Sequence, residues 1–432
     1  MTQLLSIAVA LAGGLFMTRI VGKFKLPDVT AYLIAGLLIG PSILGRLAIP
    51  GLGFMSFEDV KSLDIICDIA LGFIAFAIGN EFRLEQIRKI GKQALIVGIF
   101  QAVATSALVD IILVALHFFI PDVLSIPAVI TLGAIASATA PAATLMVVRQ
   151  YKAKGPVTEI LLPVVALDDA VGLVIFSFSF GIAKAINSGT ASLSEIIGEP
   201  IIEILLSLAF GAMCGWLLSK AEAIFNSNRN RNTLVVSFVI LTVAVSKAVF
   251  SVAHFKCGFS SLLVCMMLGT IFCNLSPLSE DIMQRSDSWT APLMTLFFVL
   301  SGASLRLDLL SDMNIILIGM VYIISRSLGK YLGARFSSKL AGCSDDIIKY
   351  LGITLLPQAG VALGMSSLAM TGLGDADGGL IRNITLFGVL IYELVGPSLT
   401  KRALTKAGDI QPKSAEVENR RAEKIKKAHG SL

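Results

Sequence analysis

Apolar residues fill long stretches of this chain, from its first residues to about position 403. Short polar or charged segments separate the stretches, and most reach the roughly 20 residues that an α-helix needs to cross a bilayer. The pattern therefore predicts an all-α, polytopic membrane protein with about thirteen spanning helices. We expect these helices at roughly 3–20, 28–46, 62–80, 93–118, 126–149, 158–184, 196–221, 232–250, 256–274, 288–304, 312–337, 347–370 and 380–401.

Composition supports a membrane protein. Of the 432 residues, 55% are hydrophobic and 15% are charged, whereas a soluble protein carries about 25% charged residues. The first apolar run, Leu4 to Met17, has neither a preceding basic region nor a small-residue cleavage site, so we interpret it as a spanning helix and not as a removed signal. The net charge of +5 comes from basic loops and a basic tail and does not indicate a nucleic-acid partner.

The basic residues of the loops fall mainly on one side of the expected membrane. Loops after odd-numbered spans are rich in lysine and arginine, as between Arg83 and Lys92, and the segment after the last span is also basic. Because cytoplasmic loops carry the excess of positive charge, we expect the N-terminus outside and the C-terminus in the cytoplasm. Residues 1–403 would form the membrane domain and residues 404–432 a short cytoplasmic tail.

Two adjacent acids, Asp168 and Asp169, interrupt the apolar run from Ile160 to Ile182. They lie about ten residues into the expected span, or about 15 Å by helical rise, near the middle of the membrane. A charged side chain is costly at that depth, so an intramembrane acid is a functional candidate by default. Adjacent helical residues point about 100° apart, so the two carboxyls face different neighbours, but they titrate as a coupled pair.

Prolines interrupt two other expected spans at membrane depth. In the fifth span Pro141 follows Ser137 and Thr139, and in the twelfth span Pro357 precedes Gly360. A proline removes a backbone donor and clashes with the preceding turn, so each helix should kink or unwind. Carbonyls freed in this way persist only inside protein or beside a wet cavity. The alternative is a plain proline kink that neighbouring helices absorb.

Two basic residues, Arg326 and Lys330, are spaced i, i+4 in the eleventh span and share one helix face. Lys330 lies about 17 residues, or about 25 Å, from the outer end of the span, which is deeper toward the cytoplasm than the aspartates. Its ammonium either snorkels to the inner surface or reaches the aspartates through helix tilt and its four-carbon stem.

The two broken spans occupy corresponding places in two triplets of helices. Spans four to six cover about 93–184, spans eleven to thirteen cover about 312–401, and the expected topology orients them in opposite directions. Paired broken segments of this kind are the best sequence pointer to a transporter site at the interface of an inverted repeat. The two triplets would form the core, with opposed half-helix ends meeting near the midplane. The remaining helices would form a scaffold or a dimer interface.

Other chemistry is poorly represented in the sequence. The six cysteines form no C-x-x-C pair and the three histidines do not cluster, which argues against a transition-metal site or a disulfide framework. The chain has no nucleophile–base set, metal motif or phosphate-binding glycine loop, so we expect neither an enzyme nor a cofactor. A buried Asp–Asp–Lys cluster that only holds helices together is the structural alternative.

These features together resemble the monovalent cation:proton antiporters, in particular the electrogenic branch that carries an aspartate pair. The resemblance covers the chain to about residue 403. Beside the aspartate pair, it rests on the Thr139–Pro141 break, on Gly329-Lys330 with Gly333, and on the early motifs Pro27-x-x-x-x-Tyr32-Leu33-x-Ala35-Gly36-Leu37-Leu38-x-Gly40-Pro41 and Ala70-Leu71-x-Phe73-x-x-Phe76-x-x-Gly79-x-Glu81-Phe82. It implies an inverted-repeat fold with two crossed broken helices, working as a homodimer in a bacterial inner membrane.

The resemblance also implies roles for single residues. Asp169 would carry the cation and the proton, and Asp168 would be its partner, in a salt bridge with Lys330 in one state. Thr139 and nearby oxygens, including that of Ser137, would complete the shell of the monovalent cation.

Three further residues bear on the resemblance. Arg326 would compensate charge by holding acidic groups or span ends, and Glu81 would be structural or lie at the mouth of an ion funnel. Ala140 stands where the electroneutral branch carries an acid, which argues against that branch.

We therefore expect a secondary active antiporter that exchanges Na⁺, or alternatively K⁺, for protons by alternating access at the aspartate pair. A proton and a cation that compete for one carboxylate produce exchange by themselves. Two alternatives belong to other classes: a sodium-coupled symporter of an organic anion on a similar fold, and a non-transporting membrane receptor or channel.

Overall fold

The computed structural model describes residues 2–24, 26–47, 53–85, 91–188, 193–247, 250–252, 255–308 and 312–410. Apart from one small hairpin, the regular structure in these ranges is helical. The first half contains α1 (Thr2–Val21), η1 (Gly22–Phe24), α2 (Asp28–Ile39), η2 (Leu44–Leu47), α3 (Phe57–Lys61), α4 (Asp64–Asn80), α6 (Lys92–His117), α7 (Ile126–Ala136), α8 (Pro141–Tyr151) and α9 (Pro156–Ser188). The second half contains α10 (Leu193–Glu222), α11 (Asn228–Ser246), β1 (Phe250–Val252), β2 (Phe255–Cys257), α12 (Ser261–Leu275), α13 (Ser279–Ala303), α14 (Met313–Leu340), α15 (Asp345–Thr354) and α16 (Gly360–Lys406).

Seven helices within these ranges are long and apolar enough to cross a membrane, and three shorter apolar helices accompany them. The all-α, multi-pass architecture expected from the sequence is therefore confirmed, while the count of thirteen spans remains a prediction. Both expected breaks are present as gaps between helices. Residues 137–140 separate α7 from α8, and residues 355–359 separate α15 from α16.

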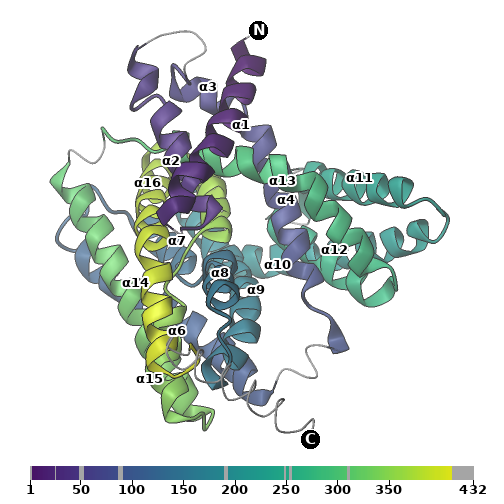
Figure 1. Cartoon of the computed structure of the whole chain (residues 1–432). Coiled ribbons are helices and arrows are strands. Elements are labelled where there is room, and N and C mark those ends of the chain that lie inside the picture. The colour runs from purple at the N-terminus through teal and green to yellow at the C-terminus, as the bar shows by residue number, and fades with distance from the viewer. Residues whose placement is uncertain are drawn as a thin grey trace, which may run out of the picture.

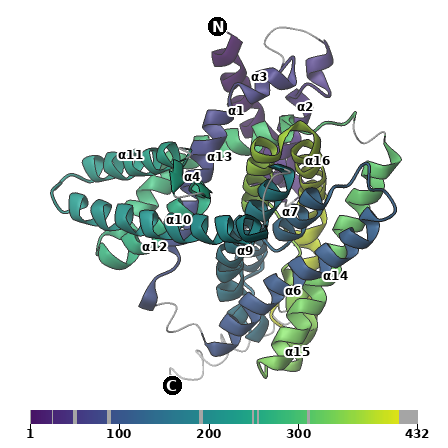
Figure 2. The ribbon, with the colours of Figure 1, turned by 180° about the vertical axis from the view of Figure 1, so that it is seen from behind.

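The helices form two groups with the broken segments between them. Helices α6, α14 and α15 lie along one side of the molecule, and α10, α11 and α12 extend to the other (Figures 1 and 2). Helix α14 packs along α6, and α7 and α8 pack against both α9 and α16. Helices α1, α2, α4, α12 and α13 form a further set, which we call the scaffold helices. In this set α2 packs on α13 and α4 packs on α12. Helix α9, which carries both aspartates, lies between the two groups (Figure 2).

Glycines allow two scaffold helix pairs to pack with their backbones in contact. A Cβ on Gly36 of α2 would lie 1.9 Å from the carbonyl oxygen of Val299 in α13, and one on Gly79 of α4 would lie 1.8 Å from that of Met266 in α12. No side chain fits in these gaps, so close packing of the scaffold explains two glycines of the early motifs.

Hydrogen bonds to side chains fix the starts of α7 and α9. Ser125 caps α7 by accepting from the backbone of Ala128 at 3.1 Å. Asp409, which follows α16, accepts from both the backbone N–H and the hydroxyl of Thr158 at 2.7 Å each. The chain that follows α16 is thereby fastened to the first turn of α9, the helix of the aspartate pair.

Two expected helix boundaries are wrong. The eighth span, placed at 232–250, ends at Ser246, and the ninth, placed at 256–274, begins at Ser261. The intervening chain forms the β1–β2 hairpin, in which Phe250 pairs with Cys257. The twelfth span, placed at 347–370, is divided between α15 and the start of α16, and non-helical backbone at Gly374, whose φ is 78°, separates it from the helix of the thirteenth span. The tail from 411 onward lies outside the described residues.

Candidate functional site

The two breaks lie against each other in the centre of the molecule. The backbone N–H of Ala140, in the first break, donates to the carbonyl of Pro357, in the second, at 2.9 Å. The amide nitrogen of Gln358 donates to the carbonyl of Ile135 at 3.0 Å and to the hydroxyl of Tyr322 at 3.1 Å. Pro141 is the first residue of α8, a position where a missing N–H costs nothing. Each break therefore satisfies polar groups that the other one frees.

Arg326 of α14 binds the freed carbonyls of both breaks. Its guanidinium donates to Ala136 at 3.0 Å and to Ala138 at 2.7 Å in the first break, and to Leu356 at 2.7 Å in the second. The ring of Tyr392 covers the guanidinium at 4.4 Å from the ring centroid. The side chain is completely buried, and such charge-assisted bonds are what make a buried cation tolerable. Of the two roles considered for Arg326, the structure places it at the span ends and not on an acid.

Lys330, one turn further along α14, is also completely buried, so it does not snorkel to the surface. Its ammonium lies 2.7 Å from Oδ2 of Asp168. It also donates to the carbonyl of Ser137 and, at 3.2 Å, to Oε1 of Gln101. The lysine thus bridges an aspartate of α9, the first break and α6.

Asp168 is fully buried and has a complete set of donors. Besides Lys330, the hydroxyl of Thr139 donates to Oδ2 and the amide of Gln101 donates to Oδ1. The amide of Gln101 therefore holds both members of the ion pair, one through its nitrogen and one through its oxygen. A buried ion pair is stable only when its remaining hydrogen-bonding capacity is used, as it is here.

Asp169 has different surroundings. Its side chain is 3% exposed and its Oδ1 has no hydrogen-bond partner among the described residues. The backbone N–H of Thr139 is directed at its carboxyl. Both carboxyl oxygens of Asp168 therefore have hydrogen-bond donors, whereas Oδ1 of Asp169 has none among the described residues.

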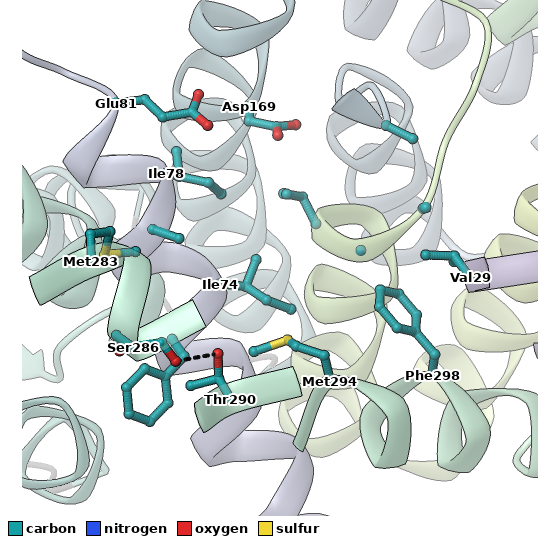
Figure 3. Close-up of a pocket in the computed structure, with 16 residues that line it drawn as sticks. Val29, Ile74, Ile78, Glu81, Asp169, Met283, Ser286, Thr290, Met294 and Phe298 are labelled. Atoms are coloured by element: carbon teal, nitrogen blue, oxygen red, sulfur yellow. Dashed lines mark hydrogen bonds between the residues drawn. The ribbon is translucent and has the colours of Figure 1, made fainter. Parts of the chain in front are cut away.

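The Asp169 carboxyl lines a cavity of about 390 Å³ between the core and the scaffold. Figure 3 shows Glu81 and Asp169 near each other at one end, with Met294 and Phe298 toward the other. Glu81 is exposed, so the cavity reaches the surface where α4 ends. The remaining lining is mostly apolar and comes from α2, α4, α13 and the start of α16: Val29, Phe73, Ile74, Ala77, Ile78, Met283, Ser286, Thr290, Ala359, Gly360 and Val361, together with Ala140.

The half-helix ends divide the site electrostatically. Helices α7 and α15 end at the breaks, and Arg326 and Lys330 bind the carbonyls at and just beyond these ends. Ala140 and Gly360, at the starts of α8 and α16, line the same cavity as Asp169. A helix carries about half a positive charge at its N-terminus and half a negative charge at its C-terminus. The cations therefore meet the negative ends, and the open carboxyl lies beside the positive ends.

The positions of two predicted ligands differ from expectation. The hydroxyl of Thr139 was expected beside Asp169, but it donates to Asp168, and only the Thr139 backbone faces Asp169. The hydroxyl of Ser137 donates to the carbonyl of Ala134 in its own helix, so Ser137 serves Lys330 through its carbonyl alone. The structure brings Asp168, Thr139, Ser137, Arg326, Lys330, Pro141, Pro357 and Gly360 into one region around the crossing.

Sequence reasoning missed Gln101 and Tyr322. Gln101 is a lone amide in the apolar run of α6, about nine residues from its start, and this isolation is a signal that could have identified it. Tyr322 lies one turn before Arg326 and is completely buried. Within the described ranges no three His, Cys, Asp or Glu residues converge into a metal-binding group.

Comparisons with known proteins agree with this geometry. The profile of the family described as sodium/hydrogen exchanger, transmembrane, matches residues 7–406. The chain is 22% identical over 395 residues to the K(+)/H(+) antiporter subunit KhtU of Bacillus subtilis, covering 89% of each protein. It is 23% identical over 353 residues to the Na(+)/H(+) antiporter NhaS4 of Synechocystis, covering 78% of this chain and 82% of the relative.

Among solved structures, the sodium proton antiporter MjNhaP1 from Methanocaldococcus jannaschii shares the fold. The two superpose with a TM-score of 0.70 over 92% of this chain and 97% of that one, at 20% identity. Since the family profile spans nearly the whole membrane region, the chain belongs to the sodium/hydrogen exchanger family and is a multi-pass monovalent cation:proton antiporter.

Proposed function

We propose that this antiporter exchanges Na⁺ for protons at Asp169, by alternating access across the crossed breaks. One observation carries the proposal: of two adjacent buried acids, only Asp169 lines the cavity and keeps an unpaired oxygen within the described structure. A hard monovalent cation prefers oxygen ligands, and a carboxylate at a cavity wall offers them together with water. Asp169 would therefore bind either the cation or a proton.

Asp168 and Lys330 form the fixed half of the proposed site. The ion pair is buried and fully hydrogen-bonded, so it balances charge without taking up an ion. Asp168, Asp169, Lys330 and Arg326 together have a net charge of zero when Asp169 is ionised, because two carboxylates balance two cations. Binding of one monovalent cation or one proton then gives the same charge, which is the condition for the two to replace each other.

The breaks would supply the remaining ligands. The carbonyls of Thr139 and Ala140, the hydroxyl of Thr139 and water are the oxygen ligands that could join the carboxylate of Asp169, because the carbonyls of Ser137 and Ala138 are bound by Lys330 and Arg326. In the conformation described, the Thr139 hydroxyl is committed to Asp168. We therefore propose that cation binding at Asp169 changes the hydrogen bonding of Thr139, so the break itself senses occupancy.

The cavity supplies the ion path on one side. Glu81, which is exposed, and Asp169 lie near each other at one end of the cavity (Figure 3). A carboxylate at the mouth raises the local cation concentration. From the distribution of basic loops, we propose that this mouth faces the cytoplasm of a bacterial cell and that the N-terminus lies outside. The helices outside the two core triplets would form the interface of a homodimer.

Potassium is the second candidate cation. The observation that favours it is the likeness to KhtU, whose name describes a K(+)/H(+) antiporter subunit. Nothing in residue identity separates the two ions, because selectivity depends on the size of the site when loaded.

The test is exchange in proteoliposomes that hold an imposed pH gradient. Na⁺, Li⁺, K⁺ and Rb⁺ are added in turn, with and without a membrane potential clamped by an ionophore. The proposal predicts gradient dissipation by Na⁺, and the runs with a clamped potential show whether the exchange moves net charge. It also predicts competition, so that lowering the pH raises the apparent KM for Na⁺. Dissipation by none of the cations would contradict the proposal, and dissipation by K⁺ alone would select the second candidate.

A further inference from the structure

A third buried acid, Glu393 of α16, lies outside the site described above. Its side chain is 1% exposed. The hydroxyl of Thr30 in α2 donates to its Oε2 at 3.4 Å, and its Oε1 has no hydrogen-bond partner among the described residues. The contact joins a core helix to a scaffold helix, two elements that otherwise touch only along a small area.

No cation balances this carboxyl in the part of the chain that the structure describes. Every ion pair found there involves other acids, and Thr30 is the only side chain that acts on the Glu393 carboxyl. The guanidinium of Arg326, which lies over the ring of the neighbouring Tyr392, is committed to three carbonyls. Helices α2, α4, α7, α8, α9, α13, α14 and α15 pack against α16. Their titratable groups include Asp28 and Tyr32 on α2, Asp64, Cys67 and Asp68 on α4, Asp168 and Asp169 on α9, and Tyr322, Arg326 and Lys330 on α14, beside Tyr392 on α16 itself.

An ionised carboxylate in this position would be a buried, unpaired charge at membrane depth. Such a charge costs several kcal/mol or more, and a group that can neutralise itself does so instead. A protonated carboxyl is neutral and needs only hydrogen-bond partners, one of which Thr30 supplies. The geometry of the α2–α16 contact therefore fits a carboxyl that holds a proton.

The same turn of α16 contacts the second break and the arginine that binds both breaks. Tyr392 covers Arg326 and donates to the carbonyl of Ile323 at 2.7 Å. A Cβ on Gly396 would lie 2.9 Å from the ring of Pro357, so this turn fits closely against the second break. On the α2 side, Val29 lines the Asp169 cavity next to Thr30. Glu393 is therefore close in the chain to residues that contact Arg326 and Pro357, and it is bonded to α2 beside a residue that lines the Asp169 cavity.

We propose that Glu393 is a second proton-binding site of this antiporter, whose proton closes the contact between α2 and α16. The inference rests on the exchange function proposed above. With the proton bound, the contact is neutral and stays buried as observed. An ionised carboxylate must be hydrated, and the buried contact shields it from solvent. Loss of the proton therefore favours separation of α2 from α16. Glu393 would then set the pH range in which the core can leave the scaffold, without carrying the exchanged ion.

The experiment separates this role from competition at Asp169. Exchange is measured at saturating Na⁺ across a pH series, where competition at Asp169 is overcome and only the maximal rate remains. Wild type should show a maximal rate that rises with pH, by up to about tenfold per pH unit on its acidic limb, as for one ionising carboxyl. Glu393→Gln is neutral at every pH. It should retain exchange, but its maximal rate should stay at every pH at the low value that wild type shows at acidic pH. A Glu393→Gln profile that follows the wild type would overturn the proposal.

A control and a direct readout complete the test. Thr30→Val removes the hydroxyl but keeps the carboxyl, so it should keep a rising profile; a flat profile in this variant would reduce Glu393 to a hydrogen-bonding role and overturn the proposal. Infrared spectra of the membrane-embedded Asp169→Asn protein should contain a carboxylic C=O band at neutral pH that disappears when Glu393→Gln is added, and no loss of the band would refute the proton site. The infrared band does not depend on exchange activity. It therefore tests the proton site at Glu393 even if the proposed exchange function proves wrong.

Discussion

The ammonium of Lys330 lies 2.7 Å from Asp168, while the next residue in the chain, Asp169, faces a cavity. Successive residues of an α-helix point about 100° apart, so one helix turn presents its two acids to different surroundings. The first acid balances buried charge and the second remains open. Asp168 and Asp169 should therefore respond differently to substitution.

Removing the cation of the ion pair should destabilise the fold. Lys330→Gln leaves Asp168 buried without its charge partner, and breaking a buried pair costs about 3–5 kcal/mol. The double variant Asp168→Asn/Lys330→Gln should lose less, because no unpaired charge remains. Thermal unfolding in detergent measures both. Lys339→Gln, an exposed position on the same helix, serves as the control. A double variant that is no more stable than Lys330→Gln alone would contradict the pairing.

Gln101 should act as a positioning residue for the pair. Gln101→Leu has a similar length but neither donor nor acceptor, so Asp168 and Lys330 each lose a buried partner. We expect a loss of about 1–3 kcal/mol in stability and a changed pH dependence of exchange, because the charge balance next to Asp169 is altered. Gln93→Leu, an exposed glutamine on the same helix, should change neither. An unchanged pH profile in Gln101→Leu would leave Gln101 with a packing role only.

Arg326 should not tolerate lysine. A lysine ammonium cannot reach Ala136, Ala138 and Leu356 in the geometry of a planar guanidinium, and each charge-assisted bond that is lost costs about 1.5–3 kcal/mol. Arg326→Lys should therefore unfold at a lower temperature and lose exchange. The matched substitution Arg335→Lys, on an exposed part of the same helix, should have no effect on either. Wild-type stability in Arg326→Lys would show that the guanidinium does not hold the breaks together.

Asp409 should stabilise α9 without entering the transport chemistry. Asp409→Ala removes the cap on Thr158, and loss of such a cap costs about 0.5–2 kcal/mol. Asp409→Asn keeps an acceptor oxygen and should lose less. The apparent KM for the exchanged cation should remain at the wild-type value in both variants, since the aspartate pair lies several turns away on α9. A lower melting temperature measured in detergent with an altered KM would mean that the cap also positions the site.

Much of this architecture follows from local sequence signals. Spanning helices follow from apolar runs, and the breaks follow from Pro141 and Pro357, because one residue type is enough to exclude a helical hydrogen bond. The i, i+4 spacing of Arg326 and Lys330 correctly places both on one buried face. The family assignment follows from several such signals in a fixed order.

Long-range partners could not be predicted in the same way. The 232–250 and 256–274 boundaries fail because the short strands Phe250–Val252 and Phe255–Cys257 are mainly apolar, like the ends of the flanking helices. Spacing indicates that Lys330 shares a face with Arg326, but not that Gln101 lies opposite or that Thr139 turns its hydroxyl to Asp168. Such choices depend on helix tilt and on which breaks cross, and these are set by packing between residues far apart in the chain.

The most direct test of the account compares Asp169→Asn with wild type in proteoliposomes. Asparagine keeps the shape of the side chain, but it has no negative charge to balance the cation and no group that titrates. The account predicts that Asp169→Asn inserts and folds with a wild-type melting profile, while Na⁺ no longer dissipates an imposed pH gradient. Glu159→Gln, an exposed acid in the first turn of the same helix, should exchange normally. Full Na⁺-dependent exchange by Asp169→Asn would contradict the assignment of the transported ions to this carboxyl.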